Sequence, residues 1–389
     1  MKRFLSGITW NVLLLGFVSL FTDLSSQMVF PLIPLYLTSV LGAGAYAVGL
    51  IEGAAETTAS FLKVLSGYWS DKVKKRKPFV FLGYFLSTIS KPLFAFVATW
   101  YFVLGVRVLE RIGKGVRNAP RDAIVAESTD PKHRGVAYGF HRAMDGLGSV
   151  GGALAAYFLL PILGYEKIFL YAFIPGALGL VFILMVKEGK QQEAEKKQKK
   201  LRVSLAGLPK ELKFFLVVSF VFTLGQFGYA FLLLKAKVVG YSDSSAILFY
   251  TLFYTLYTLS SIPFGMLSDK IGRKPVLTLG YGLFAATCVG LIFFANTQTI
   301  VFFFLLYGIF FSVIDGVQRA FVVDLSPNDV KATALGAFHT AVGFAALPGG
   351  FIAGLLWDRV GDTATYVWGL ALTVFAIALL QLVKTKKNQ

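Results

Sequence analysis

Five basic residues recur at helical spacing in the stretch RVLERIGKGVRNAPRDA, residues 107–123. At about 100° per residue they fall within an arc of about 120° on one helix face. Such a stripe binds anions or pairs with carboxylates, and facing lipid it would cost about 2.5–3.5 kcal/mol per charge at mid-bilayer. It therefore predicts either an anion-attracting cavity or a network of buried ion pairs. Its members are Arg107, Arg111, Lys114, Arg117 and Arg121.

Carboxylates that could partner this stripe, or carry protons, stand in two other apolar segments. Glu52 and Glu56 are one helical turn apart, and Asp23 stands in the first apolar segment, four residues before Gln27. Because burial favours the protonated form of a carboxyl group, Glu52 and Glu56 are the candidates for proton coupling. We expect Asp23 and Glu56 to lie near Arg111.

The elements that position these residues are expected to be membrane-spanning helices. The chain of 389 residues is 56% hydrophobic and only 15% charged, with a mean hydropathy of +0.67, whereas soluble domains are about a quarter charged. A span needs about 20 mostly apolar residues. Twelve segments satisfy that length, near residues 8–37, 46–69, 78–98, 99–124, 135–160, 166–186, 210–235, 244–267, 275–295, 298–324, 332–357 and 363–383.

The distribution of charge supports this topology. With both termini in the cytoplasm, 25 Lys and Arg residues fall in cytoplasmic segments and 4 in outer loops, as the positive-inside rule requires. The net charge of +17 thus needs no nucleic acid partner. The single cysteine, Cys288, excludes a disulfide framework. We find no nucleophile, metal or cofactor motif, and we expect neither an enzyme nor a bound cofactor or metal.

The two halves of the chain resemble each other. GYWSDKVKKRKP begins at Gly67 and GMLSDKIGRKP begins at Gly265, 198 residues later. The same offset pairs Phe140-His141 with Phe338-His339, Gly151-Gly152 with Gly349-Gly350, and Arg121 with Arg319. An internal duplication of six spans is typical of transporters. We predict an N-terminal bundle over 1–186, a charged cytoplasmic linker over 187–209 and a C-terminal bundle over 210–389.

The repeated segments resemble the signature G-x-x-x-D-[RK]-x-G-[RK]-[RK] of the major facilitator superfamily. The copy from Gly265 to Lys274 matches in full, whereas the first copy has Lys74 in place of the internal glycine. The resemblance implies an all-α polytopic membrane protein with two pseudo-symmetric six-helix bundles that rock around a central site. It also implies a cytoplasmic gate built on the signature aspartates. The gating residues we expect are Asp71, Arg76, Arg117, Arg121, Asp269 and Arg273.

The second half lacks the basic stripe. At the same offset Arg107 and Arg111 become Leu305 and Ile309, and aromatic or hydroxyl side chains dominate instead. This asymmetry suggests a solute that is anionic on one side and apolar on the other. The substrate and coupling residues we expect are Asp23, Gln27, Glu52, Glu56, Arg107, Arg111, Gln226, Tyr229, Tyr254 and Asp315, with Tyr250 and Tyr257 beside them.

These features predict a secondary active transporter in the cell membrane, surrounded by lipid and acting as a monomer. It would move a small anionic or amphipathic solute by alternating access, coupled to protons or another ion. A flippase for lipids or amphiphiles, or a drug exporter, is the alternative in the same fold. A non-transporting membrane sensor or a membrane-embedded enzyme is a third class, and the lack of catalytic motifs argues against the enzyme.

Overall fold

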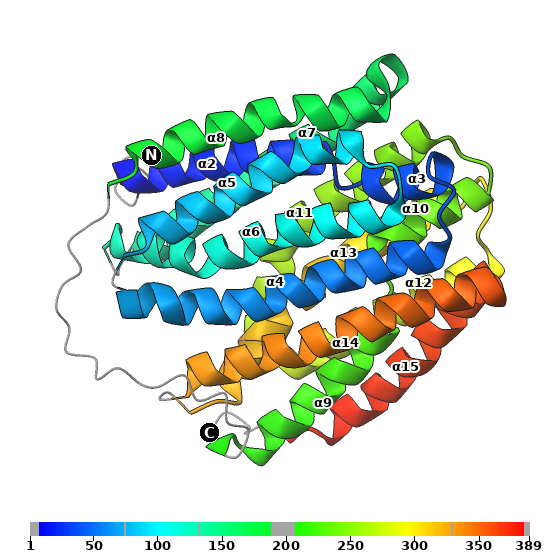
Figure 1. Cartoon of the computed structure of the whole chain (residues 1–389). Coiled ribbons are helices and arrows are strands. Elements are labelled where there is room, and N and C mark those ends of the chain that lie inside the picture. Colours follow the sequence, from blue (N-terminus) through cyan, green and yellow to red (C-terminus); the bar gives the residue numbers. More distant parts are fainter. Residues whose placement is uncertain (1–7, 74, 131–132, 188–206, 328–329, 385–389) are drawn as a thin grey trace. The chain divides into compact units, whose positions relative to one another are not determined.

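The computed structural model describes residues 8–73, 75–130, 133–187, 207–327 and 330–384 (Figure 1). Within these residues every regular element is a helix, which confirms the predicted all-α class. The α-helices are α2 (Trp10–Gln27), α3 (Leu32–Ser39), α4 (Ala45–Val73), α5 (Lys77–Leu93), α6 (Trp100–Glu127), α7 (Arg134–Tyr171), α8 (Phe173–Met185), α9 (Lys210–Gly225), α10 (Tyr229–Val238), α11 (Asp243–Ile271), α12 (Arg273–Phe293), α13 (Ile300–Asp324), α14 (Lys331–Arg359) and α15 (Asp362–Leu382); a 3-10 turn, η1, covers Phe94–Phe96.

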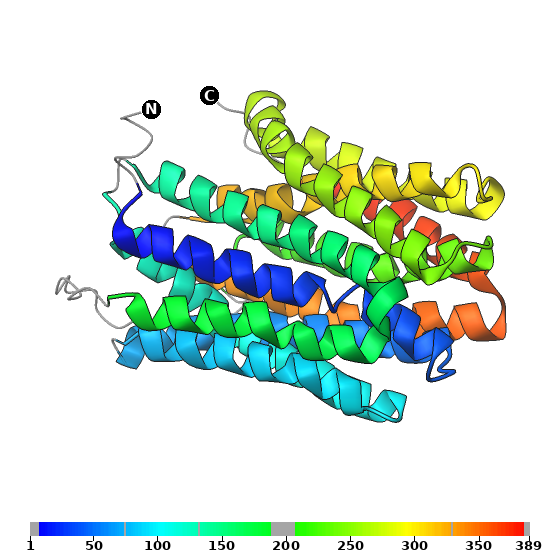
Figure 2. The same cartoon turned by 90° about the horizontal axis from the view of Figure 1, so that it is seen from above.

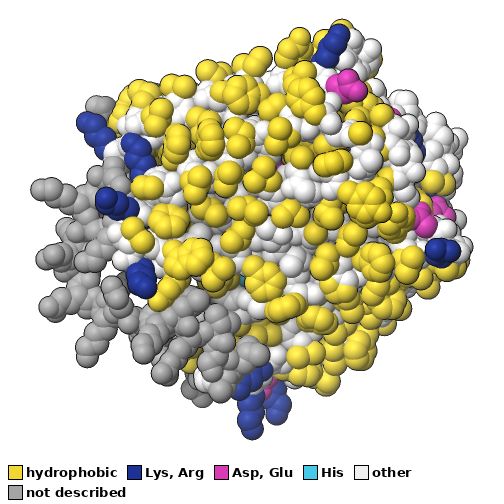
Figure 3. All heavy atoms as spheres, viewed as in Figure 1, with side chains coloured by type: hydrophobic (Ala, Val, Ile, Leu, Met, Phe, Trp, Pro, Cys, Tyr) yellow, Lys and Arg dark blue, Asp and Glu magenta, His cyan; other side chains and the backbone are white. Residues whose placement is uncertain are grey.

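The helices account for the twelve predicted spans. By length and apolar composition, nine segments of the described chain could cross a membrane, and the segment Arg134–Met185 contains two spans. Those two spans meet at a kink at Gly164, where the backbone leaves the helical conformation. Helices α4 and α6, which carry the charged residues, complete the twelve. Apolar side chains cover most of the face in Figure 3, as a lipid-facing surface requires.

The described chain separates into two compact units. The first unit comprises residues 1–36 and 58–200, and the second comprises residues 37–57 and 201–389. Helix α4 therefore contributes its first half to the second unit and its second half to the first. The predicted linker stays a prediction, because residues 188–206 lie outside the described part of the chain.

Close backbone contacts hold the first unit together. Helix α2 lies beside α7 and α8 (Figure 2). A Cβ atom at Gly148 of α7 would lie 2.2 Å from the carbonyl oxygen of Leu20, so only glycine fits there. Helices α5 and α6 cross just as closely, since a Cβ atom at Gly83 would lie 2.5 Å from the carbonyl oxygen of Gly113. Small residues allow helices to approach in this way.

The second unit has an aromatic core instead. The rings of Phe222 and Tyr281 stack with centroids 3.9 Å apart, and Phe284 packs against Phe227 and Tyr307. The hydroxyl of Tyr307 donates to the carbonyl oxygen of Phe227 at 2.8 Å. Ring burial therefore stabilises this unit, and the buried hydroxyl has a partner.

Candidate functional site

The first and seventh predicted spans are each interrupted near the middle. Helix α2 ends at Gln27 and α3 begins at Leu32, while α9 ends at Gly225 and α10 begins at Tyr229. Each was predicted as one continuous span, over 8–37 and 210–235. Irregular backbone at membrane depth is tolerated only where it is buried in protein or lines an aqueous cavity. Breaks at corresponding places in two repeats therefore point to a binding region.

The signals of these breaks are present in the sequence. Pro31 lies in the first break and Pro34 in the first turn of α3, while Gly225 and Gly228 flank the second break. Proline disfavours a helical conformation in the residue before it, and glycine weakens a helix interior. The continuous apolar character of both segments concealed these signals.

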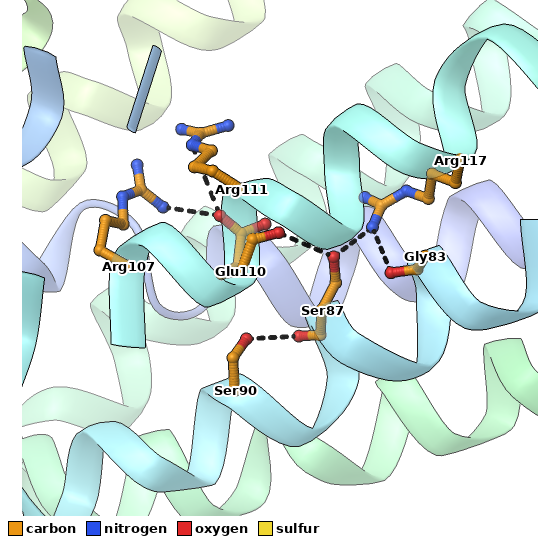
Figure 4. A network of polar contacts seen from close by, with 7 residues as sticks. All are labelled: Gly83, Ser87, Ser90, Arg107, Glu110, Arg111 and Arg117. Carbon is orange, nitrogen blue, oxygen red and sulfur yellow. Dashed lines mark hydrogen bonds and ion pairs between the residues drawn. The ribbon is translucent and has the colours of Figure 1, made fainter. Parts of the chain in front are cut away.

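A buried charge cluster lies beside the first break. Nη1 of Arg107 is 3.3 Å from Oε2 of Glu110, and Nε of Arg111 is 3.4 Å from the same oxygen (Figure 4). The side chains of Arg107 and Glu110 are 0% exposed, and that of Arg111 is 9% exposed. Two guanidinium groups thus share one carboxylate oxygen, and these three side chains carry one net positive charge.

Phe30 connects this cluster to the break. Its ring lies under both guanidinium groups, with its centroid 4.1 Å from Cζ of Arg107 and 5.0 Å from Cζ of Arg111. Cation–π contacts of this kind hold a guanidinium group in place when it is shielded from water. The break therefore positions the ring that supports the two arginines.

The carboxylate of the cluster was not among the predicted site residues. We expected Asp23 and Glu56 near Arg111, whereas the contact found is with Glu110, the preceding residue of the same helix. Glu52 and Glu56 belong to the second unit, where Glu52 is half-buried and Glu56 is exposed. The i, i+3 spacing of Arg107 and Glu110 was the signal that could have found this pair.

Arg117, in the second half of the basic stripe, connects α6 with α5 through side-chain contacts. Arg117 is buried, and its Nη1 donates to the hydroxyl of Ser87 and, at 3.5 Å, to the carbonyl oxygen of Gly83 (Figure 4). Its guanidinium group also lies 4.4 Å from the ring centroid of Tyr84. These contacts give Arg117 a role in helix packing. Arg121, near the end of the stripe, contacts the neighbouring Asp122 at 2.9 Å.

Lys91 is a buried lysine that was not among the predicted site residues. It lies one turn beyond Ser87 on α5 and is 0% exposed, and its Nζ atom has no hydrogen-bond partner within the described residues. The charged groups that act on it most strongly are Arg117, Glu110 and Asp23. A buried amino group without a hydrogen bond destabilises the fold around it.

Lys91→Met is therefore expected to stabilise the protein by about 1–3 kcal/mol, because methionine has a similar length and needs no hydrogen bond. Thermal unfolding of the purified protein measures this change. Lys77→Met is the matched control on the same helix and should destabilise, since Nζ of Lys77 donates to the carbonyl oxygens of Leu184 and Val186. A lower melting temperature for Lys91→Met would contradict the prediction.

The predicted aromatic wall of the second unit is assembled as a row. The centroids of Tyr250 and Tyr254 are 5.9 Å apart, and those of Tyr254 and Tyr257 are 5.3 Å apart. Tyr229 adjoins Tyr250 at 5.0 Å. The hydroxyl of Tyr257 donates to Oδ2 of Asp315 at 3.0 Å.

Polar residues border this row of tyrosines. Asp315 also pairs with Arg319 at 2.9 Å, and Gln226 lies in the break just after α9. At the break of the first unit Gln27 ends α2 and is buried, and Asp23 is half-buried one turn earlier. The 198-residue offset pairs Gln27 with Gly225, so the glutamines of the two breaks lie within one residue of corresponding places in the repeats.

Ion pairs at the ends of the helices reveal how the repeats correspond. Arg76 contacts Glu127 at 3.0 Å, and Arg273 contacts Asp324 at 3.1 Å. Lys274 donates to the carbonyl oxygens of Gln381 and Val383, as Lys77 does to residues 184 and 186. Each residue of the first unit named here is separated from its counterpart in the second unit by 197 residues rather than 198. The difference arises because the first signature copy has one extra residue.

This offset corrects the comparison of the two halves between residues 76 and 127. Arg107 and Glu110 correspond to Phe304 and Tyr307, and Arg121 corresponds to Gln318 rather than to Arg319. The charge cluster of the first unit thus occupies the place of the aromatic core of the second. The asymmetry predicted from sequence persists under the corrected correspondence.

The signature residues of the predicted gate are described in part. Arg273, the first residue of α12, bridges Asp269 at the end of α11 and Asp324 of α13. Gly272, between α11 and α12, has a φ of 98°, which favours glycine. The side chain of Asp71 and the whole of Lys74 lie outside the described part of the chain.

Comparison with known proteins places the chain in a family. The model of the Major Facilitator Superfamily matches residues 15–344, and a second match covers residues 215–388. This chain belongs to the major facilitator superfamily. An MFS-type transporter of Methanocaldococcus jannaschii is 42% identical to it over 378 residues, which cover 95% of this chain and 94% of that protein.

Solved transporters share the fold. The nucleoside transporter NupG superposes with a TM-score of 0.75 at 17% identity, covering 96% of this chain and 98% of that one. A D-xylose–proton symporter gives a TM-score of 0.74 at 16% identity, with coverage of 96% and 98%. At these identities the likeness concerns the fold alone. The predictions of a multi-pass membrane protein and of its superfamily are confirmed.

Proposed function

We propose that this major facilitator protein is a secondary active transporter that moves a small anionic or amphipathic solute by alternating access, coupled to protons. It acts as a monomer in the cell membrane, with both termini in the cytoplasm. The observation that carries the proposal is the trio of Arg107, Glu110 and Arg111 beside the break in the first span. Its net positive charge, buried next to irregular backbone, suits an anionic group on the solute.

The aromatic row of the second unit supports the amphipathic part of this proposal. Tyrosines offer ring faces to an apolar solute surface and hydroxyls to its polar edges. Tyr254 packs between its neighbours in the row, and Asp315 accepts a hydrogen bond from Tyr257. We propose Tyr229, Tyr254, Gln226 and Asp315 as contacts for the solute in this unit.

We propose that the ion pairs of the two signature loops form the cytoplasmic gate. In the proposed cycle, the contacts of Arg76 with Glu127 and of Arg273 with Asp269 and Asp324 form when that side closes and break when it opens. Exposed ion pairs of this kind are each worth no more than about 1 kcal/mol. They can therefore exchange during a transport cycle.

The test uses proteoliposomes that contain a pH-sensitive dye under an imposed proton gradient. Pools of carboxylates, phosphate esters and amphipathic anions are added, and solute-dependent proton flux is measured. Flux with an anionic pool supports the proposal. A dye signal that no solute pool changes would contradict proton coupling. Transfer of labelled phospholipid between leaflets without proton flux would favour the flippase alternative.

Arg111→Met is expected to reduce the flux at least tenfold at low solute concentration. A hydrogen bond to a charged group contributes about 1.5–3 kcal/mol, and 1.4 kcal/mol is a factor of ten in affinity. We choose Arg111 because its side chain is 9% exposed, whereas the side chains of Arg107 and Glu110 are fully buried. Arg134→Met, which removes an exposed arginine from the start of α7, is the control and should leave the flux unchanged. Equal flux in both variants would remove Arg111 from the solute site.

A further inference from the structure

A buried histidine in the first unit has polar partners at both ring nitrogens. Nε2 of His141 lies 3.2 Å from the hydroxyl oxygen of Ser19 on α2, and Nδ1 lies 3.6 Å from Oδ1 of Asp145 on α7. Both His141 and Ser19 are buried. The close packing of α2 on α7 at Gly148 holds the two helices in this register.

The hydrogen-bond donors and acceptors around His141 favour one neutral tautomer. Nη1 of Arg121 lies 3.5 Å from the hydroxyl oxygen of Ser19, and a guanidinium group can only donate. The hydroxyl proton of Ser19 therefore has two acceptors, Nε2 of His141 and the carboxylate of Asp145. A neutral ring with its proton on Nδ1 presents that proton to the carboxylate of Asp145, whereas the other tautomer would present a lone pair to it. The surroundings therefore favour the tautomer that carries its proton on Nδ1 and accepts from Ser19 at Nε2.

This arrangement has a place for one additional proton. A proton that binds His141 must attach at Nε2, because Nδ1 already carries one. The Ser19 hydroxyl then rotates, so that its oxygen accepts from Nε2 as well as from Arg121. The resulting imidazolium faces Asp145, whose Oδ1 atom is buried and has no hydrogen bond within the described residues. Only a hydroxyl rotation is needed, so the packing of α2 and α7 stays unchanged.

The charges around the chain are of both signs. Asp23 stands one turn after Ser19 on α2 and interacts electrostatically with Asp145. Helix α8 contributes no ionisable side chain. The other groups that face these residues are Tyr84 of α5, Lys114, Arg117, Arg121 and Asp122 of α6, and Arg142 of α7.

We infer that His141 and Asp145, oriented by Ser19 and Arg121, form a proton-binding site within the first unit, with Asp23 as the next carboxylate along α2. This inference rests on the proposed coupling of transport to protons and names the residues that carry it. The proton is held either on Nε2 of His141 or on the carboxylate of Asp145. Glu52 and Glu56, the carboxylates first selected from the sequence, are not needed for this step.

Nitrogen-15 NMR of histidine-labelled protein in lipid bilayers tests the site without any solute. The chain has three histidines, so replacing His133 and His339 with Gln leaves His141 as the single labelled ring. We expect the widely separated nitrogen signals of the Nδ1-protonated tautomer at high pH. As the pH falls they should be replaced by the nearly equal pair of signals of imidazolium. A ring that stays neutral at every pH at which the protein remains folded would overturn the inference.

Two variants separate this role from simple packing. In Ser19→Ala the directing hydroxyl is lost, and signals of both neutral tautomers should appear at high pH. In Asp145→Asn the conversion to imidazolium should require a lower pH, because the carboxylate that faces the added charge is absent. A helix-packing histidine would show one unchanged spectrum in both variants, and that result would also overturn the inference.

The proteoliposome assay distinguishes failure of this inference from failure of the proposed function. His141→Gln should lose solute-dependent proton flux while labelled solute still exchanges across the membrane. If the parent protein shows no proton flux with any pool, the proposed coupling fails and the NMR titration alone decides whether His141 binds a proton. Full proton flux in His141→Gln would remove the site from the coupling path.

Discussion

Glu110→Ala is expected to destabilise the protein by about 3–5 kcal/mol, the usual cost of removing one partner from a buried ion pair. Glu110 is fully buried and its Oε2 atom contacts both Arg107 and Arg111. Its removal leaves two guanidinium groups close together over the ring of Phe30, without the carboxylate between them. The melting temperature of the purified protein measures the effect.

Glu127→Ala provides the matched control for this prediction. Glu127 ends the same helix and pairs with Arg76 at 3.0 Å, but its side chain is 44% exposed. Water screens such a pair, so its loss should cost no more than about 1 kcal/mol. The double variant Glu110→Ala with Arg107→Met should recover part of the stability, because it removes one of the two remaining charges. Equal effects of Glu110→Ala and Glu127→Ala would show that the cluster is hydrated.

The helices of this protein are largely predictable from its sequence. The span expected over 244–267 is helix α11, Asp243–Ile271, and the span over 275–295 is α12, Arg273–Phe293. Apolar length determines where a chain crosses a membrane, and the charged loops mark the ends. The interruption after Gln27 was missed because hydropathy measures composition, whereas a break depends on backbone geometry around Pro31.

The candidate site was predictable only in part. The period of the basic residues on α6 indicated that they share one face, and the structure brings Arg107 and Arg111 together. Their carboxylate partner was sought on other helices, because Asp23 and Glu56 were expected to lie near Arg111. Which carboxylate contacts an arginine depends on side-chain rotamers and burial, and neither is visible in residue spacing.

His141 shows the same limit more clearly. A single histidine in an apolar helix is usually a packing residue, and its spacing to Asp145, one turn away, does not distinguish that role. The deciding observation is Ser19, 122 residues earlier in the chain, at 3.2 Å from Nε2. Contacts between segments so far apart in sequence follow from how α2 packs on α7, and a single sequence does not contain that information.

Gly49→Ala is expected to destabilise the second unit by about 3 kcal/mol, the upper end of the usual cost of overpacking. A Cβ atom at Gly49 of α4 would lie 1.9 Å from the carbonyl oxygen of Gly350 on α14. In return, a Cβ atom at Gly350 would lie 2.3 Å from the carbonyl oxygen of Gly49. The obstacle in both cases is backbone, which cannot move aside as a flexible side chain can.

The contact between α4 and α14 extends to the N-terminus of α4, where the substitution would disturb two hydrogen bonds. Asp358 of α14 accepts hydrogen bonds from the backbone N–H groups of Ala45 and Tyr46, at 2.9 Å and 2.8 Å. A carboxylate at a helix N-terminus satisfies free N–H groups and interacts favourably with the helix dipole. Separating α4 from α14 at Gly49 would lengthen these bonds as well, so Asp358→Asn combined with Gly49→Ala should cost little more than Gly49→Ala alone.

Gly316→Ala is the control, since Gly316 lies within α13 and has open space at its Cβ position. Alanine favours a helix by about 1 kcal/mol over glycine, so this variant should be slightly stabilised while Gly49→Ala is destabilised. The melting temperature of the purified protein measures both changes. An unchanged value for Gly49→Ala would contradict the prediction.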